Sequence, residues 1–170
     1  MRDATAEDAA GITRVRTRTW QAAYAHVFPA EQLATLTPET GLDWWRRAVA
    51  EPFPHMHTLV AEVEGGVAGF ANLGAARDDP EAQTGELFAI YVLPEASRGG
   101  VGRALMAETL ARLHVEGFAA AILWVIEDNP RTRRFYELAG WRLDGGVKDE
   151  EWLGTVVREL RYRIALGRMT

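Results

Sequence analysis

A short stretch between an apolar run and an amphipathic run carries residue types that bind anions. Residues 97–103 read Ser-Arg-Gly-Gly-Val-Gly-Arg. The run before it, 86–94, predicts a strand that is buried on both faces, and the run after it predicts a helix. A helix start offers unpaired N–H groups and the positive end of the helix dipole, and glycine lets the backbone approach a phosphate closely. We therefore expect a diphosphate cradle, to which Arg98 and Arg103 add positive charge.

Other interpretations of these glycines compete with the cradle. A tight turn would need glycine for its backbone conformation alone. A dinucleotide-binding fingerprint would need glycine where Leu105 stands and an acidic residue about 20 residues later. A P-loop would need a Gly-Lys-Ser/Thr triplet, which the sequence lacks. The loop by itself leaves the tight turn and the cradle as equal alternatives.

A second stretch, 127–141, predicts a short helix with a clear start and stop. Asn129 is the expected N-cap, Pro130 the first helical residue and Gly140 the stop signal. Tyr136 follows Asn129 by seven residues, so the two side chains share one helix face. Considered alone, this tyrosine is more typical of a core residue with its hydroxyl at the rim.

Together the two stretches resemble the two cofactor-binding blocks of the GNAT N-acetyltransferase superfamily. The loop pattern Arg/Gln-x-x-Gly-x-Gly/Ala maps onto 97–102, although Ser97 holds the first position and Arg98-Gly99 stand in reversed order. Residues 2–24 are similar to the first strand and helix of many bacterial members. The second block matches at Asn129, Tyr136, Glu137, Gly140 and Trp141.

The resemblance implies acetyl-CoA as the cofactor and CoA as a product. Its diphosphate would lie on the N–H groups of Arg98, Gly99, Gly100, Val101, Gly102 and Arg103. Its pantetheine arm would pair with the strand edge at Ile90, Tyr91 and Val92, as an added strand does. Asn129 would hold the arm, and Arg133 would meet the outer phosphates, unless Arg131, Arg133 and Arg134 simply form a solvated helix face.

Acetyl transfer to an amine requires a base, stabilisation of the carbonyl oxygen and a proton for the leaving thiolate. The resemblance implies Tyr136 as the acid and the Val92 N–H as the donor to the oxygen. Glu86, at the start of the strand that carries Val92, is the first candidate for the base, and burial would raise its pKa. Glu127 is a second candidate. The remaining candidates are histidines on the expected acceptor side, His26, His55 and His57.

The acceptor side is expected to be formed by the N-terminal helices and the loops near 24–33 and 51–58. Trp20, Tyr24 and Phe28, with Glu86, are the predicted acceptor-binding residues, because aromatic walls suit an apolar or cationic ligand. A helix-packing cluster is the alternative, and at least one of Trp44 and Trp45 should be core. The sequence does not specify the acceptor, and an alcohol remains open.

The elements that must position these residues predict a mixed α/β (α+β) domain. A long helix is expected over 6–24, and two short helices follow near Pro29 and Pro38. A hairpin at Gly65-Gly66, a polar loop over 78–85 and two buried strands, each followed by a helix, come next. Two final strands, over 141–146 and 152–164, complete the order. This order predicts a largely antiparallel sheet with one splayed parallel pair and helices on both faces. The expected regions are an acceptor side (1–58), a central sheet with the loop (59–126) and a second cofactor block with the last strands (127–170).

Composition limits the remaining possibilities. The 170 residues, 48% of them hydrophobic, suit one domain with a real core, and no apolar run is long enough to span a membrane. The net charge of −5 argues against nucleic acid or an anionic membrane as partner. The absence of cysteine excludes a disulfide, a thiolate metal site and an acyl-cysteine intermediate, which favours direct attack in a ternary complex. No metal is expected, the expected location is cytoplasmic, and a homodimer is the family-based expectation.

Two further functions explain part of the pattern. An acyl-CoA-binding regulatory module would keep the cofactor site without turnover, and the altered order at Ser97-Arg98-Gly99 leaves room for it. A nucleotide-binding protein unrelated to CoA would explain the glycines but not the block from Asn129 to Trp141. The leading prediction is an acetyl-CoA-dependent N-acetyltransferase that acts on a primary amine of a small molecule or peptide.

Overall fold

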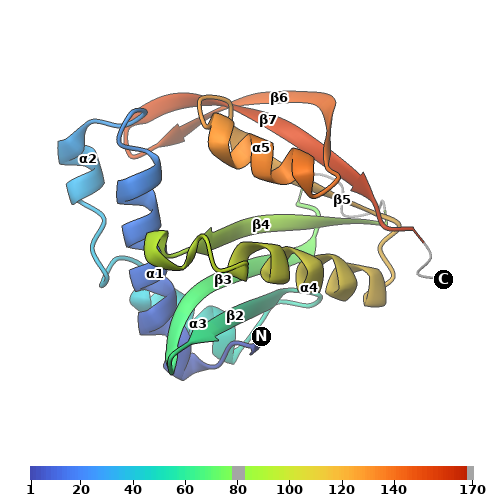
Figure 1. Cartoon of the computed structure of the whole chain (residues 1–170), viewed down its shortest axis with the longest axis horizontal. Coiled ribbons are helices and arrows are strands. Elements are labelled where there is room, and N and C mark those ends of the chain that lie inside the picture. Colours follow the sequence, from blue (N-terminus) through green and yellow to red (C-terminus); the bar gives the residue numbers. More distant parts are fainter. Residues whose placement is uncertain (78–82, 168–170) are drawn as a thin grey trace.

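The computed structural model describes residues 1–77 and 83–167, which form one mixed sheet with helices on both faces (Figure 1). The 7-stranded sheet has the order β1-β2-β3-β4-β5-β7-β6. The strands are β1 Arg2–Asp3, β2 His57–Val63, β3 Gly66–Ala75, β4 Thr84–Val92, β5 Ala120–Ile126, β6 Arg142–Trp152 and β7 Thr155–Ala165. The helices are η1 Ala6–Asp8, α1 Ala9–Ala23, α2 Ala30–Ala34, α3 Leu42–Ala50, η2 Pro94–Ala96, α4 Val101–Val115 and α5 Pro130–Leu138.

Two hydrophobic layers hold the helices against the sheet. α4 and α5 lie in front of the sheet in Figure 1, where Leu105, Leu113 and Tyr136 pack on side chains of β2 to β5 and β7. On the other face, Ile12 of α1 and Trp45 of α3 pack on β2 and β3. The predicted fold class, a mixed and mostly antiparallel sheet with helices on both faces, is confirmed.

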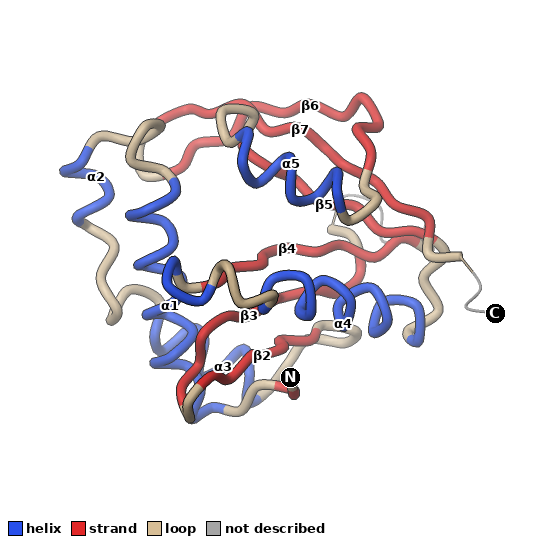
Figure 2. The backbone as a smooth tube through the Cα atoms, viewed as in Figure 1, coloured by secondary structure: helices blue, strands red, loops and turns tan. Residues whose placement is uncertain are grey.

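The single parallel pair of the described strands is β4 with β5, and it is short. The two strands pair only from Thr84 opposite Ala120 to Glu86 opposite Ile122. Two residues later β4 contains a bulge, because its register with β3 skips Phe88. A bulge bends a strand and increases its twist, so it turns β4 away from β5. Figure 2 shows β4 separating from the β5–β7–β6 half of the sheet toward the end where α1 lies.

We call the diverging segments, 88–92 of β4 and 123–126 of β5, the fork. Its wide end is bridged by α1 and the residues that follow it. The Thr19 hydroxyl bonds the Val92 carbonyl at 3.2 Å, and the His26 ring bonds the Asp128 carbonyl at 2.5 Å. The fork is the predicted splayed strand pair.

The N-terminal helix is less uniform than predicted. Residues 6–8 form a 3-10 turn, η1, before α1 begins at Ala9. Thr5 and Asp8 form a capping box, in which the Thr5 N–H donates to an Asp8 carboxylate oxygen at 2.7 Å. Arg2 donates to both oxygens of Asp8, at 2.7 and 2.9 Å. The first helical region is therefore fixed by charge as well as by packing.

Two other boundaries differ from the sequence-based expectation. The helix expected near Pro38 begins only at Leu42, after Gly41 in the left-handed conformation (φ +81°). β6 does not end at Gly145-Gly146 but continues to Trp152, because these glycines lie in an irregularity of the β6–β7 register. The loop expected over 78–85 lies partly outside the described residues, and Thr84 and Gly85 belong to β4.

Candidate active site

The backbone of β4 presents unpaired groups to the fork at alternate residues. The Leu93 N–H donates to the Ala68 carbonyl at 2.8 Å, so the next pair along the ladder, Val92 with Gly69, is non-hydrogen-bonded. The N–H and C=O of Val92, and by the same alternation those of Ile90, therefore point away from β3 toward the fork. Tyr91 differs, because its backbone faces Phe70 of β3.

The start of α4 offers the N–H groups expected of an anion site. Gly100 is its N-cap with φ +80°, a conformation that favours glycine. The first helical hydrogen bond runs from the Ala104 N–H to the Gly100 carbonyl, so the N–H groups of Val101, Gly102 and Arg103 have no carbonyl partner within the helix. This end of α4 therefore presents three N–H groups without helical partners at the place where the cradle is predicted.

Arginine side chains flank this helix start. Arg98 and Arg103 are exposed, and an Arg103 guanidinium nitrogen lies 3.7 Å from the position of a Cβ on Gly100. Arg103 thus folds back over the loop. A Cβ on Gly102 would lie 3.6 Å from the Phe135 ring and 3.7 Å from Val92, which places the helix start beside the fork and beside α5.

Asn129 caps α5 as predicted and leaves half of its amide unused. Its Oδ1 accepts a hydrogen bond from the Thr132 N–H at 3.2 Å. Its Nδ2 is buried and has no hydrogen-bond partner among the described residues. Tyr24 lies near this amide, which lowers the tyrosine's pKa slightly against the much larger rise that burial causes. A buried donor without a partner is costly, so it marks a position where a ligand carbonyl would be stabilised.

Tyr136 lies on the α5 face that covers the fork. The residue is 6% exposed, and its ring is 6.3 Å from that of Tyr162 and 6.4 Å from that of Trp141. Its hydroxyl makes no hydrogen bond to the described residues and is not sealed from solvent. Burial, with a smaller contribution from Tyr91, raises the pKa of Tyr136. The phenol therefore stays protonated at neutral pH, as a proton donor must.

The arginines at the start of α5 are placed differently from one another. Arg133 donates to the Tyr162 hydroxyl at 3.2 Å and to the Glu127 carbonyl at 3.3 Å, and the Tyr162 contact raises its pKa. It links α5 to β5 and β7 in this structure, whereas Arg131 and Arg134 are exposed. A phosphate contact from Arg133 would require it to leave these partners.

Glu86 is buried at the narrow end of the fork and is engaged by Arg77. One carboxylate oxygen lies 2.6 Å from an Arg77 guanidinium nitrogen, and the other accepts the Arg77 backbone N–H at 3.0 Å. The side chain is 1% exposed. Glu127, the second predicted base, is exposed, and His55 and His57 both bond Glu116 at the far end of α4.

The predicted acceptor-binding aromatics form a packed cluster. Trp20, Tyr24 and Phe28 are 3%, 7% and 3% exposed, and the Trp20 ring stacks 5.7 Å from Phe28. Trp45 is core, while Trp44 is half exposed, as expected of adjacent helical residues. The cluster closes the wide end of the fork, so these side chains present little surface in this structure.

Sequence reasoning missed a buried carboxylate on the same face. Glu159 of β7 is 6% exposed and pairs across the sheet with Ile126, the last residue of β5. A charged residue within the alternating pattern of β7 was the available signal. Its neighbourhood depends on strand pairing, which the sequence does not reveal.

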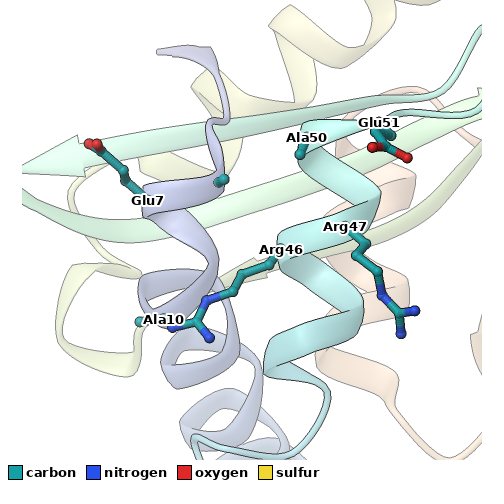
Figure 3. Close-up of a pocket in the computed structure, with 7 residues that line it drawn as sticks. Glu7, Ala10, Arg46, Arg47, Ala50 and Glu51 are labelled. Atoms are coloured by element: carbon teal, nitrogen blue, oxygen red, sulfur yellow. The ribbon is translucent and has the colours of Figure 1, made fainter.

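The described residues also form a cavity of about 480 Å³ away from the fork (Figure 3). It lies between the start of α1 and α3 and is lined by Ala6, Glu7, Ala10, Arg46, Arg47, Ala50 and Glu51. It is open and contains two arginines and two glutamates, so its charges balance. None of the predicted site residues reaches it.

Fold and site together define a mixed α/β domain in which a helix start with free N–H groups lies beside a strand fork. The acetyltransferase (GNAT) family model matches residues 15–141. The chain belongs to this family, and the predicted resemblance and enzyme class, an acyltransferase, are confirmed.

Curated relatives agree with this assignment. The chain is 36% identical over 131 residues to an uncharacterized N-acetyltransferase, YuaI, of Bacillus subtilis, covering 76% of this chain and 73% of that protein. It is 39% identical over 95 residues to the mycothiol acetyltransferase of Frankia alni, covering 51% of this chain but only 28% of that longer protein.

Solved structures share the fold. The PaiA N-acetyltransferase of Thermoplasma acidophilum in complex with coenzyme A has a TM-score of 0.74 at 20% identity, covering 96% of each chain. YncA of Salmonella typhimurium with acetyl-CoA has a TM-score of 0.72 at 20% identity, covering 99% of this chain and 94% of that one. Within residues 1–77 and 83–167, no helix is both long and apolar enough to cross a membrane.

Proposed function

We propose that the protein is an acetyl-CoA-dependent N-acetyltransferase that acetylates a primary amine by direct attack in a ternary complex. The observation that carries this proposal is the convergence of three features at the fork. These are the free N–H groups at the start of α4, the fork-facing backbone of Ile90 and Val92, and the open hydroxyl of Tyr136.

The residues present fit this coenzyme. The N–H groups of Val101, Gly102 and Arg103 suit the diphosphate, and the Arg103 guanidinium lies over the same loop. Arg98, Gly99 and Gly100 complete the loop, whose glycines leave room beside the backbone. The amide-rich arm suits the fork edge of β4 at Ile90 and Val92, and the unpartnered Asn129 Nδ2 suits one of its carbonyls.

The chain's own groups then provide the chemistry, since acetyl-CoA supplies an acetyl thioester when bound. A β4 N–H that faces the fork stabilises the negative charge that develops on the carbonyl oxygen, and Val92 is the predicted donor. Tyr136 donates a proton to the departing sulfur, for which its raised pKa keeps it protonated. Glu86 is the base that the sequence predicts first. Because Arg77 occupies both of its oxygens, it would act through a water.

The test is Tyr136→Phe, with Tyr162→Phe as the matched control. We expect Tyr136→Phe to lower kcat by roughly 10²- to 10⁴-fold and to leave acetyl-CoA binding within about threefold. Tyr162 bonds Arg133 and Glu137, so its variant should lose stability but keep its turnover. Free thiol release with a panel of primary amines follows the reaction, and calorimetry follows binding.

Three results would contradict parts of this proposal. An unchanged kcat in Tyr136→Phe would show that Tyr136 is not the acid. Binding of CoA without turnover on any amine would favour the regulatory module instead. Binding of ATP or NAD in place of CoA would exclude both the acetyltransferase and the regulatory module. Parallel double-reciprocal lines would contradict direct attack, since they indicate a ping-pong reaction.

A further inference from the structure

Glu159 lies at the wide end of the fork on the face opposite α4. It pairs with Ile126 of β5 on one side and with Lys148 of β6 on the other. Its neighbour Leu160 packs in the core under α4 and α5, so Glu159 points to the opposite face, as Val157 does. The start of α4 and Tyr136 occupy the first face. An acceptor that attacks across the fork must therefore arrive on the face that carries Glu159.

The Glu159 carboxylate is buried but incompletely engaged. Its nearest cation, the Lys148 ammonium, lies 3.4 Å from one oxygen, and the Trp152 indole is the other donor beside it. A 94%-buried glutamate held by so long an ion pair is costly for folding alone.

Aromatic side chains surround this carboxylate. The Trp152 indole lies beside it, and the Trp20 ring lies 5.6 Å from that of Trp152. Tyr91 of β4 and Tyr24, the residue that follows α1, are close enough for Glu159 to raise the pKa of both phenols. The indole nitrogens of Trp20 and Trp152 are buried without hydrogen-bond partners among the described residues. Aromatic rings around one carboxylate favour an organic ammonium ion.

We propose that Glu159 binds the acceptor's ammonium group and takes its proton, and that the acceptor is a primary amine on an apolar or aromatic stem. The inference rests on the proposed function and names the substrate class of that site. The N–H bond breaks, its electron pair stays on nitrogen, and the proton forms an O–H bond on Glu159. Nitrogen loses two protons overall and Tyr136 gives one to sulfur, so one proton is released to water per turnover.

Strand geometry favours Glu159 over Glu86. Glu86 stands opposite Ile122 at the narrow end, whereas Glu159 stands beside Ile126. Four residues separate these levels on β5, which is about 13 Å at about 3.3 Å per residue. The fork-facing N–H groups of Ile90 and Val92 lie beyond the bulge, on the Glu159 side. Arg77 also holds Glu86 at 2.6 Å, while the Lys148 ammonium lies 3.4 Å from the nearer oxygen of Glu159.

Burial raises the pKa of Glu159, and Lys148 and Trp152 lower it by less. The charged and titratable groups facing it are Lys148 and Glu150 of β6, Tyr91 of β4, and Tyr24 just after α1, with Arg16 of α1 beside Tyr91. A carboxylate must be ionised to accept a proton, so activity is lost as the pH falls through the raised pKa. The folded-state pKa exceeds the unfolded one, so ionisation opposes folding, and stability falls as the pH rises through this titration.

The experiment compares Glu159→Gln with Glu150→Gln, an exposed carboxylate that also pairs with Lys148. We expect Glu159→Gln to lower kcat/KM for 2-phenylethylamine by at least about 100-fold and to remove the acidic limb of its pH profile. Its unfolding free energy at pH 7 should equal or exceed that of the wild type, whereas a purely structural ion pair predicts a loss. Glu150→Gln should keep both the kcat/KM and the acidic limb of the pH profile.

A binding measurement makes the test independent of turnover. In the presence of CoA, 2-phenylethylamine should raise the Tm of the wild type more than 2-phenylethanol does, and Glu159→Gln should abolish this preference. If Glu159→Gln does not fold, Glu159→Asp should keep the limb with a lower kcat/KM, and an unchanged kcat/KM would overturn the proposal. Equal Tm shifts for amine and alcohol, or a limb that disappears only in Glu86→Gln, would also overturn it. CoA binding and thiol release that persist in those cases leave the proposed function standing.

Discussion

The hydroxyl of Thr19 on α1 donates a hydrogen bond to the carbonyl oxygen of Val92, 3.2 Å away at the wide end of the fork. This carbonyl is one of the backbone groups that we propose for pairing with the coenzyme arm. Thr17 makes a similar bond, to the Thr37 carbonyl at 3.0 Å, away from the fork. The two threonines therefore form a matched pair on one helix.

Thr19→Val and Thr17→Val should each lower the free energy of unfolding by about 1 kcal/mol, since each loses one hydrogen bond. The Tm rise caused by acetyl-CoA should be larger in Thr19→Val, because the arm would supply the donor that Val92 has lost. Thermal unfolding with and without acetyl-CoA measures both effects. Equal ligand-induced shifts in the two variants would show that the arm does not reach Val92.

Arg103→Glu should weaken CoA binding by at least about tenfold, because a charge-assisted hydrogen bond to phosphate is replaced by repulsion. Binding of acetylpantetheine, which lacks the phosphates, should change by less than about twofold. Arg46→Glu, on α3 beside the cavity of Figure 3, is the control and should leave CoA binding unchanged. Calorimetry measures the affinity for both ligands. Equal losses of affinity for CoA and acetylpantetheine would show that Arg103 does not contact a phosphate.

Gly69→Ala should disturb the fork from its β3 side. A Cβ on Gly69 would lie 2.9 Å from the Tyr91 carbonyl and 3.1 Å from Val92, so β4 must shift. We expect a loss of about 1–3 kcal/mol in stability, together with weaker acetyl-CoA binding. In Gly66→Ala, on the same strand, the atom nearest to the added Cβ would be 3.8 Å away, so no such effect should follow. If Gly69→Ala is destabilised but keeps its affinity for acetyl-CoA, the coenzyme does not bind at the fork.

Gly100→Ala should be costly for a different reason, the left-handed φ of +80° at the N-cap of α4. The strain costs roughly 1–2 kcal/mol and displaces the N–H groups that follow. Gly99→Ala is the control, because its Cβ would lie 3.5 Å from the Ala96 carbonyl, an ordinary contact. Gly100→Ala should weaken CoA more than Gly99→Ala does, and the reverse order in a titration would contradict the cradle.

Asp8→Asn should show how much the charged cap at the start of α1 contributes to stability. Arg2 is the largest cause that holds the pKa of Asp8 below its ordinary value of 3.8. The stabilisation is therefore present above that value and is lost as the pH falls through the folded-state pKa. At pH 7 the variant should lose about 1.5–3 kcal/mol in urea unfolding, and the difference should shrink in acid. The control is Asp43→Asn, which removes an exposed ion pair with Arg46 on α3. It should change the free energy of unfolding by less than about 0.5 kcal/mol.

Local features of the sequence were enough to determine the order of elements and the two cofactor blocks. The glycines at 99–102 need only their own backbone freedom, and Asn129-Pro130 need only the start of one helix. The apolar runs of β4 and β5 predicted buried strands because burial on both faces removes polar residues from the pattern. These signals act within a few residues, so the chain carries them without its partners.

The tertiary structure alone decided the chemistry around these blocks. Whether Ile90 or Tyr91 faces the fork depends on register with β3 and on the bulge at Phe88. The Arg77 contact of Glu86, the tie between Arg133 and Tyr162, and the place of Glu159 beside Ile126 all join segments distant in sequence. Burial and strand pairing set these contacts, and both are properties of the assembled sheet rather than of any local run of residues.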